Sequence, residues 1–129
     1  MSNGFKDLRV WQRAHALASR VDQLADKLPP SELYALTTQM RRAARSVSHN
    51  IAEGASRRTR PEFLQFLYIA RGSLAELEDQ LLFARERRYR ALDDQLDEDV
   101  EAVRRMLNRL ITTIANDPHK SAARRRSSP

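Results

Sequence analysis

The sequence predicts an all-α fold, an antiparallel up-down-up-down four-helix bundle. Apolar residues recur at helical spacing in four segments, and no segment shows the alternation of a strand. The composition agrees, because only three Gly and five Pro stand among 129 residues and 31% of the residues are charged. Four amphipathic helices joined by short loops bury their apolar faces against one another, which gives this bundle.

The first helix is expected from about Leu8 to Leu28, with Asp7 as its N-cap. Pro29 and Pro30 end it, because a proline ring clashes with a continuing helix and disfavours helical backbone in the residue before it. Its inner face consists of residues at helical spacing: Trp11, Ala14, Leu17, Ala18, Val21, Leu24, Ala25 and Leu28.

The second helix is expected from Ser31, which can cap it, to about Ala55. Gly54 stands near its end, where a left-handed backbone conformation is easiest for glycine. Its apolar stripe consists of Leu33, Leu36, Met40, Ala43, Ala44, Val47 and Ile51.

The third helix is long and is expected from about Arg60 to Arg88. Thr59 caps it, Pro61 is tolerated in its first turn, and Glu62 completes a capping box. Its inner face consists of Phe63, Phe66, Leu67, Ala70, Leu74, Leu77, Leu81 and Ala84.

The fourth helix is expected from about Asp94 to Asn116, with Asp93 or Asp94 as its N-cap. Acidic residues in its first turns suit the positive end of the helix dipole. We therefore expect one domain, residues 1–116, followed by a basic, disordered C-terminal tail, residues 117–129. The apolar stripe of the fourth helix consists of Leu96, Val100, Val103, Leu107, Leu110, Ile111 and Ile114.

Polar residues run along the inner faces of the second and third helices and along the flanks of these faces, and we call them the polar seam. Polar groups near a core need partners there, which an Arg42–Glu76 ion pair or a ladder of Gln, Asn and Ser hydrogen bonds would supply. We interpret the seam as a device that fixes the register of the two helices, and the alternative is a ligand-binding groove. The seam consists of Gln39, Arg42, Ser46, Asn50, Glu53, Ser73, Glu76 and Gln80.

The third helix carries a second apolar row, turned away from its inner face. Leu64, Tyr68, Ala75 and Leu82 share this row. A monomer would leave the row in water, so it predicts the interface of a homo-oligomer. The alternative is a set of ordinary exposed apolar residues.

The net charge of +6 is unevenly placed and permits anionic partners, nucleic acid above all. The tail holds four bases and one acid, so it supplies +3 of that charge. Aromatic residues do not alternate with the arginines, so contacts would be made to the phosphate backbone of RNA or DNA. The alternative is that these are solvated loop charges. The candidate contacts are Arg57, Arg58 and Arg60 in the second loop and Arg124, Arg125 and Arg126 in the tail, with a further cluster at Arg85, Arg87, Arg88 and Arg90.

The sequence contains few of the residue patterns that a catalytic, metal-binding or membrane function needs. The absence of Cys excludes disulfides and thiolate metal sites and is compatible with a cytoplasmic location. Ser46, His49 and Glu53 match a catalytic triad in composition only, because they follow one another along one helix without an oxyanion hole. The Glu-x-x-His pattern of carboxylate metal bundles is missing. We expect no enzyme activity, no metal, no cofactor, no signal peptide and no membrane span.

Several motifs, taken in order, resemble one protein family. They are FKDLRVWQRA at 5–14, LTTQMRRAA at 36–44, NIAEG at 50–54 followed by Arg57, EFL at 62–64, and GSLAELE at 72–78 followed by Gln80 and Leu81. The chain resembles, over about residues 5–115, the four-helix-bundle proteins related to those encoded in intervening sequences of large-subunit ribosomal RNA genes.

The resemblance implies a four-helix bundle that assembles as a homopentamer. A related branch, the accessory proteins of diversity-generating retroelements, is a basic pentameric bundle that binds nucleic acid and a reverse transcriptase. Our leading hypothesis is therefore a non-enzymatic oligomeric scaffold. It would bind either the phosphate backbone of a nucleic acid or a partner protein that processes nucleic acid. The alternative is a protein–protein adaptor without nucleic-acid contact.

Overall fold

The protein is all-α, with four long helices in the residues that the structure describes. A computed structural model describes residues 4–28, 30–87 and 94–116, and no strand occurs in these ranges. A short 3-10 helix, η1, spans Gly4–Asp7. The expected N-cap Asp93, Arg88, Arg90 and the tail lie outside the described residues. The long helices are α1 (Arg9–Ala25), α2 (Pro30–Ala55), α3 (Arg60–Glu86) and α4 (Asp94–Ala115).

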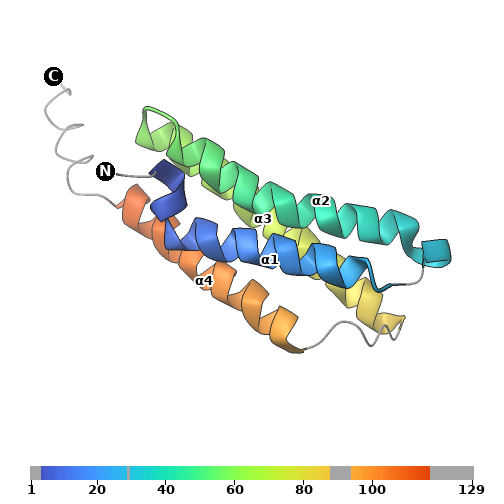
Figure 1. Cartoon of the computed structure of the whole chain (residues 1–129). Helices are drawn as coiled ribbons and strands as arrows, with labels where there is room; N and C mark the ends of the chain where they lie inside the picture. The colour runs from blue at the N-terminus through green and yellow to red at the C-terminus, as the bar shows by residue number, and fades with distance from the viewer. Residues whose placement is uncertain (1–3, 29, 88–93, 117–129) are drawn as a thin grey trace, which may run out of the picture.

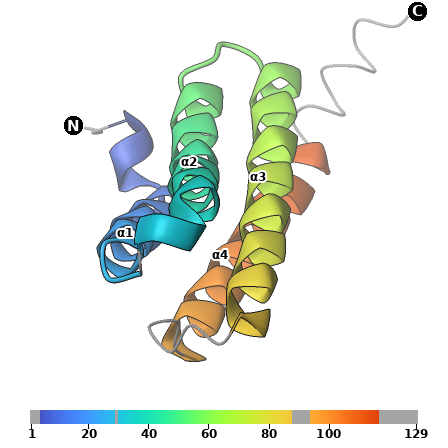
Figure 2. The same ribbon diagram turned by 90° about the vertical axis from the view of Figure 1, so that its right-hand side faces the viewer.

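The helices form a four-cornered bundle around one apolar core. α2 contacts α1 and α3, and α4 also contacts α1 and α3, so each helix has two neighbours (Figures 1 and 2). Each fully buried leucine contributes about 1.5–3 kcal/mol of transfer free energy, so this core is the main source of stability. The largest fully buried side chains are Leu17, Met40, Ile51, Leu67, Leu74, Leu77, Leu96 and Leu107, all on the predicted inner faces.

The beginnings of α1 and α2 differ from expectation. Asp7 belongs to η1, and Leu8 is the N-cap of α1 without a side-chain cap. The turn is held instead by the Leu8 amide, which donates to the Phe5 carbonyl at 3.0 Å. α2 already begins at Pro30, a residue whose fixed φ suits the first helical position, so Ser31 lies inside the helix and is not its cap.

The predicted cap of α3 is confirmed. The Glu62 amide donates to Thr59 Oγ1 at 3.3 Å, and the Thr59 hydroxyl donates to Glu62 Oε1 at 3.0 Å. Pro61 stands in the first turn, as expected. This local bonding lets α3 begin after a connection of only four residues, 56–59, and the two helices lie beside one another.

Gly54 serves packing and not the left-handed turn that we expected. It lies inside α2, it is buried, and Gly4 is the residue with a positive φ among the described glycines. A Cβ at Gly54 would stand 2.8 Å from both Phe63 Cδ1 and Phe66 Cβ. The missing side chain therefore allows the end of α2 to approach the start of α3 closely.

We expect Gly54→Ala to destabilise the protein by about 1–3 kcal/mol, because the Cβ of Phe66 is fixed to its backbone and the helices must separate. Gly72→Ala is the matched control. A Cβ at Gly72 would meet nothing within 4 Å, so better helix propensity should stabilise the fold by about 0.5–1 kcal/mol. Urea unfolding followed by circular dichroism measures both. Equal stability of the two variants would contradict this account.

Candidate functional site

The centre of the polar seam is a hydrogen-bonded group between α2 and α3. Ser46 Oγ and Ser73 Oγ lie 2.8 Å apart. Asn50 Nδ2 donates to Ser46 Oγ at 3.0 Å and to the Ser46 carbonyl at 2.8 Å. Since Ser46 Oγ accepts from Asn50, it can donate to Ser73, which is buried. The three residues thus satisfy one another across the helix contact.

The outer part of the seam differs from expectation. The expected Arg42–Glu76 ion pair does not form between these two described residues, and both side chains are exposed. Glu76 Oε1 instead accepts from Gln80 Nε2 at 3.3 Å. Gln80 is 95% buried, and its Oε1 has no hydrogen-bond partner among the described residues.

On α2, the two ends of the seam reach solvent. Glu53 pairs with Arg57 at 3.3 Å, and Gln39 is exposed. The buried residues of the seam, Ser73 and Gln80, both lie on α3. Ser46 is hydrogen-bonded to Ser73 and Asn50, and His49, the second residue of the triad-like composition, is exposed.

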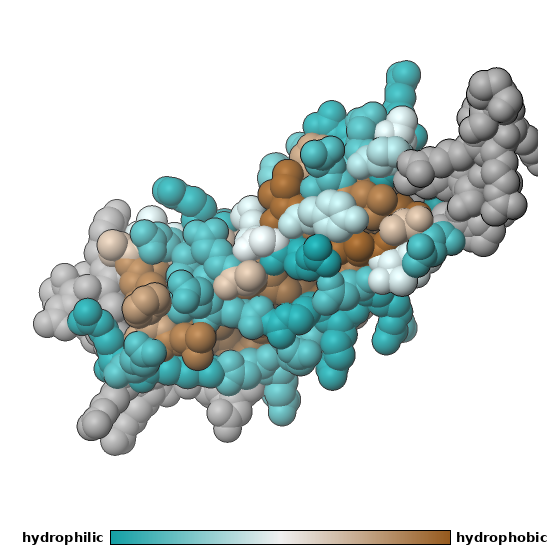
Figure 3. Space-filling view, turned by 180° about the vertical axis from the view of Figure 1, so that it is seen from behind, coloured by the Kyte–Doolittle hydropathy of each residue, from teal (hydrophilic) through white to brown (hydrophobic). Residues whose placement is uncertain are grey.

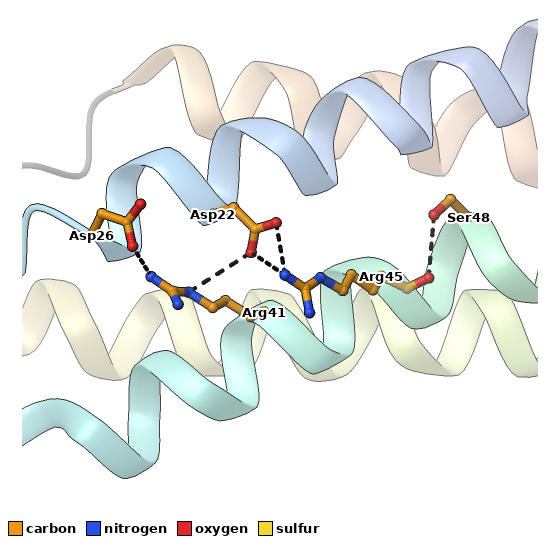
Figure 4. Close-up of polar contacts among 5 residues, drawn as sticks. All are labelled: Asp22, Asp26, Arg41, Arg45 and Ser48. Atoms are coloured by element: carbon orange, nitrogen blue, oxygen red, sulfur yellow. Dashed lines mark hydrogen bonds and ion pairs between the residues drawn. The ribbon is translucent and has the colours of Figure 1, made fainter.

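An arginine–aspartate cluster joins α1 to α2, and the sequence analysis missed it. Arg45 Nη2 donates to Asp22 Oδ2 at 3.0 Å and to Oδ1 at 3.2 Å, while Arg41 Nε lies 3.7 Å from Oδ1. Arg41 Nη2 also donates to Asp26 (Figure 4). The signal was present as two acids and two bases, each pair four residues apart on successive helices.

The second apolar row predicted on α3 has more exposed apolar members than expected, and its members are not all the predicted ones. Leu64 is only 8% exposed and packs in the core, so its assignment to this face is wrong. Further along the same line of α3, Arg71 Nη1 donates to Asn108 Oδ1 of α4 at 3.3 Å, and Glu78 pairs with Arg104 of α4, so this line turns toward the bundle and not toward solvent.

The exposed members of this face form two rows, of which the first has a seven-residue repeat and the second has two members fourteen residues apart. One row is Tyr68, Ala75 and Leu82, and Tyr68 and Leu82 are 47% and 58% exposed. Ile69 and Phe83, 48% and 54% exposed, form the second row, which the sequence analysis missed. Figure 3 views the side of the molecule that carries α3, where apolar residues reach the surface. We call these five residues the outer face of α3.

The candidate nucleic-acid contacts lie in two groups. Arg57, Arg58 and Arg60 are exposed at the α2–α3 connection, and Arg57 also lies over the Phe66 ring, 4.8 Å from its centroid. Arg85, near the other end of α3, pairs with Asp97 at 2.6 Å. Arg124, Arg125 and Arg126 lie outside the described residues.

Neither a cluster of metal-ligating groups nor a membrane-spanning helix occurs among the described residues. No group of three or more metal-ligating side chains gathers in the described ranges. None of the described helices combines the length and the apolar character that crossing a membrane needs.

Comparison with known proteins decides the family. The family model described as 23S rRNA-intervening sequence protein matches residues 6–109. The chain belongs to the 23S rRNA-intervening sequence protein family. In this member, the matched region contains η1 in part, all of α1, α2 and α3, the polar seam and most of α4. No curated protein matches the chain significantly.

We expect Ser46→Ala and Ser73→Ala each to cost about 1–2 kcal/mol, because each leaves a polar partner unpaired between α2 and α3. The double variant should cost less than the sum, with a coupling of about 0.5–1.5 kcal/mol. Ser56→Ala is the control, because it removes an exposed hydroxyl that donates to the Ala52 carbonyl at the end of α2 and makes no bond to α3. Urea unfolding measures all four. Strictly additive costs would show that the two hydroxyls do not act together.

Proposed function

We propose that this member of the family is a non-enzymatic oligomeric scaffold that assembles through the outer face of α3 and binds nucleic acid through its phosphate backbone. The observation that carries the proposal is the set of large apolar side chains exposed on α3. A row of this kind, bordered by polar residues, is typical of a protein–protein interface.

A second copy of the chain is the partner that we propose for this face. Tyr68, Ala75 and Leu82 repeat every seven residues, which is the spacing with which a helix packs lengthwise against another helix. A face that meets a different surface of the next copy gives a ring when the rotation between successive copies closes, and we propose such a ring here. The family resemblance implies five subunits, and we propose a homopentamer on that ground.

The proposal includes an up-down-up-down order of the helices. Three contacts between α3 and α4 support it, since Arg71, Glu78 and Arg85 meet partners that lie progressively earlier in α4. With this order, the arginines of the α2–α3 connection and those that end α3 lie at opposite ends of a subunit. A ring repeats each group around one end, and multivalency then raises the affinity for a long anionic partner.

The alternative function is a protein–protein adaptor without nucleic-acid contact. One observation favours it: several arginines, among them Arg41, Arg45 and Arg85, already pair with carboxylates of the same chain. Surface pairs contribute only about 0–1 kcal/mol, however, so they leave arginines available to a phosphate that competes. We therefore retain nucleic-acid binding as the first proposal.

We expect Tyr68→Glu combined with Leu82→Glu to yield smaller, folded particles, because two charges would have to be buried in the assembly. Ser19→Glu with Gln23→Glu adds the same charge to exposed positions of α1 and should leave the particle size unchanged. Light scattering after gel filtration measures the mass, and circular dichroism checks the helix content. A monomeric native protein at high micromolar concentration would refute assembly.

We expect the full-length protein to bind labelled RNA and DNA hairpins without sequence preference. Its log affinity should fall linearly with log salt, because arginines that contact phosphates release counterions. Removing residues from Ala122 onward should flatten the slope if the tail contributes. Fluorescence anisotropy at low and physiological salt measures the affinity of the full-length and the truncated protein. Absence of binding at low salt would leave the adaptor function.

A further inference from the structure

A concave site lined by three arginines and a threonine lies on the solvent side of α2. It encloses about 380 Å³, and its lining is Thr38, Arg41, Arg42 and Arg45. These positions span two helical turns, about 10 Å along the axis. No carboxylate is among the lining residues. We call this site the α2 arginine pocket.

Two of the three guanidinium groups are oriented by acids outside the pocket. Asp22 and Asp26 hold Arg41 and Arg45 from the side of α1. Figure 4 shows that one terminal nitrogen of each guanidinium points away from these aspartates. Because a guanidinium has five N–H donors, the aspartates can fix its direction and leave donors for a ligand. Part of the entropy cost of ordering long side chains is then met before a ligand arrives.

Arg42 supplies the positive charge that remains. Two arginines and two aspartates cancel within the cluster, whereas Arg42 forms no ion pair with any residue that the structure describes. Arg42 is exposed on the same side of α2 and lines the pocket. The Thr38 hydroxyl adds a neutral donor at the pocket's end. The pocket thus combines oriented donors with one uncompensated charge.

We propose that the α2 arginine pocket is a phosphodiester-binding subsite for the RNA or DNA backbone, an inference that rests on the proposed function. The planar guanidinium matches two oxygens of one phosphate, which is the reason that arginine is preferred for phosphate recognition. The lining holds no aromatic or aliphatic side chain on which a base could stack, so the site selects the backbone and not the sequence. It places a contact on the side of the bundle, away from the loops.

The test compares Arg42→Ala with Arg45→Ala against a matched control, Arg105→Ala with Arg109→Ala. The control removes the same charge from exposed positions of α4, which does not contact α2. In hairpin binding by anisotropy at about 50 mM salt, the pocket variant should bind at least about tenfold more weakly, and its salt slope should fall by about 2. The control should change affinity by about twofold or less through the general loss of charge.

The two experiments distinguish a pocket that binds no phosphodiester from a protein that binds no nucleic acid. If the native protein binds hairpins and both variants lose affinity equally, the pocket is not a subsite while nucleic-acid binding stands. If the native protein does not bind at low salt, both the function and the inference fail. Unchanged circular dichroism shows that the variants are folded.

A second measurement distinguishes a nucleic-acid backbone from a free anion. The side-chain Nε–H resonances of Arg41, Arg42 and Arg45 are followed by NMR during titration of the native protein with an RNA hairpin, a DNA hairpin or inorganic phosphate. We expect the hairpins to shift these resonances at concentrations at least about a hundredfold below phosphate, because a polymer engages several sites at once. Equal potency of inorganic phosphate would overturn the proposal and make the pocket a site for small anions.

Discussion

The close approach of α2 to α3 is the contact on which the other parts of the bundle depend. At one end Gly54 leaves no room for a Cβ against Phe63 and Phe66, and further along two serine hydroxyls meet at 2.8 Å. Both features require the two backbones to lie near one another, because short side chains cannot bridge a wide gap. α1 then packs on the free side of α2 and α4 on the free side of α3, and the four helices enclose the leucine-rich core.

This geometry gives α3 three different environments. One side carries the small and polar residues that meet α2, and a second carries the leucines of the core, Leu64 among them. The third carries large apolar side chains such as Leu82 and Phe83, which are exposed. Apolar residues on an otherwise polar surface lower the free energy of association with a matching surface. We therefore propose the outer face of α3 as the surface for assembly in this 23S rRNA-intervening sequence protein.

The charges of the molecule are organised by the same packing. Asp22 lies between Arg41 and Arg45, and Arg104 meets Glu78 from the neighbouring helix. Exposed pairs of this kind add little stability, so their main effect is to define which helices are neighbours and how side chains point. The ion pairs thereby orient the guanidinium groups of several arginines. In the α2 arginine pocket, two oriented guanidinium groups lie beside Arg42, which forms no ion pair with a described residue.

The sequence by itself determined the four helices, the buried faces, the Thr59 cap and the family, because helical periodicity and capping are local properties of the chain. Tertiary structure decided the environment of the residues of α3 that lie outside its predicted inner face. Leu64 is a core residue, whereas Ile69 and Phe83 are exposed. It also decided the role of Gly54 and the aspartate partners of Arg41 and Arg45. These depend on distances between helices, and residue spacing within one helix carries no information about such distances.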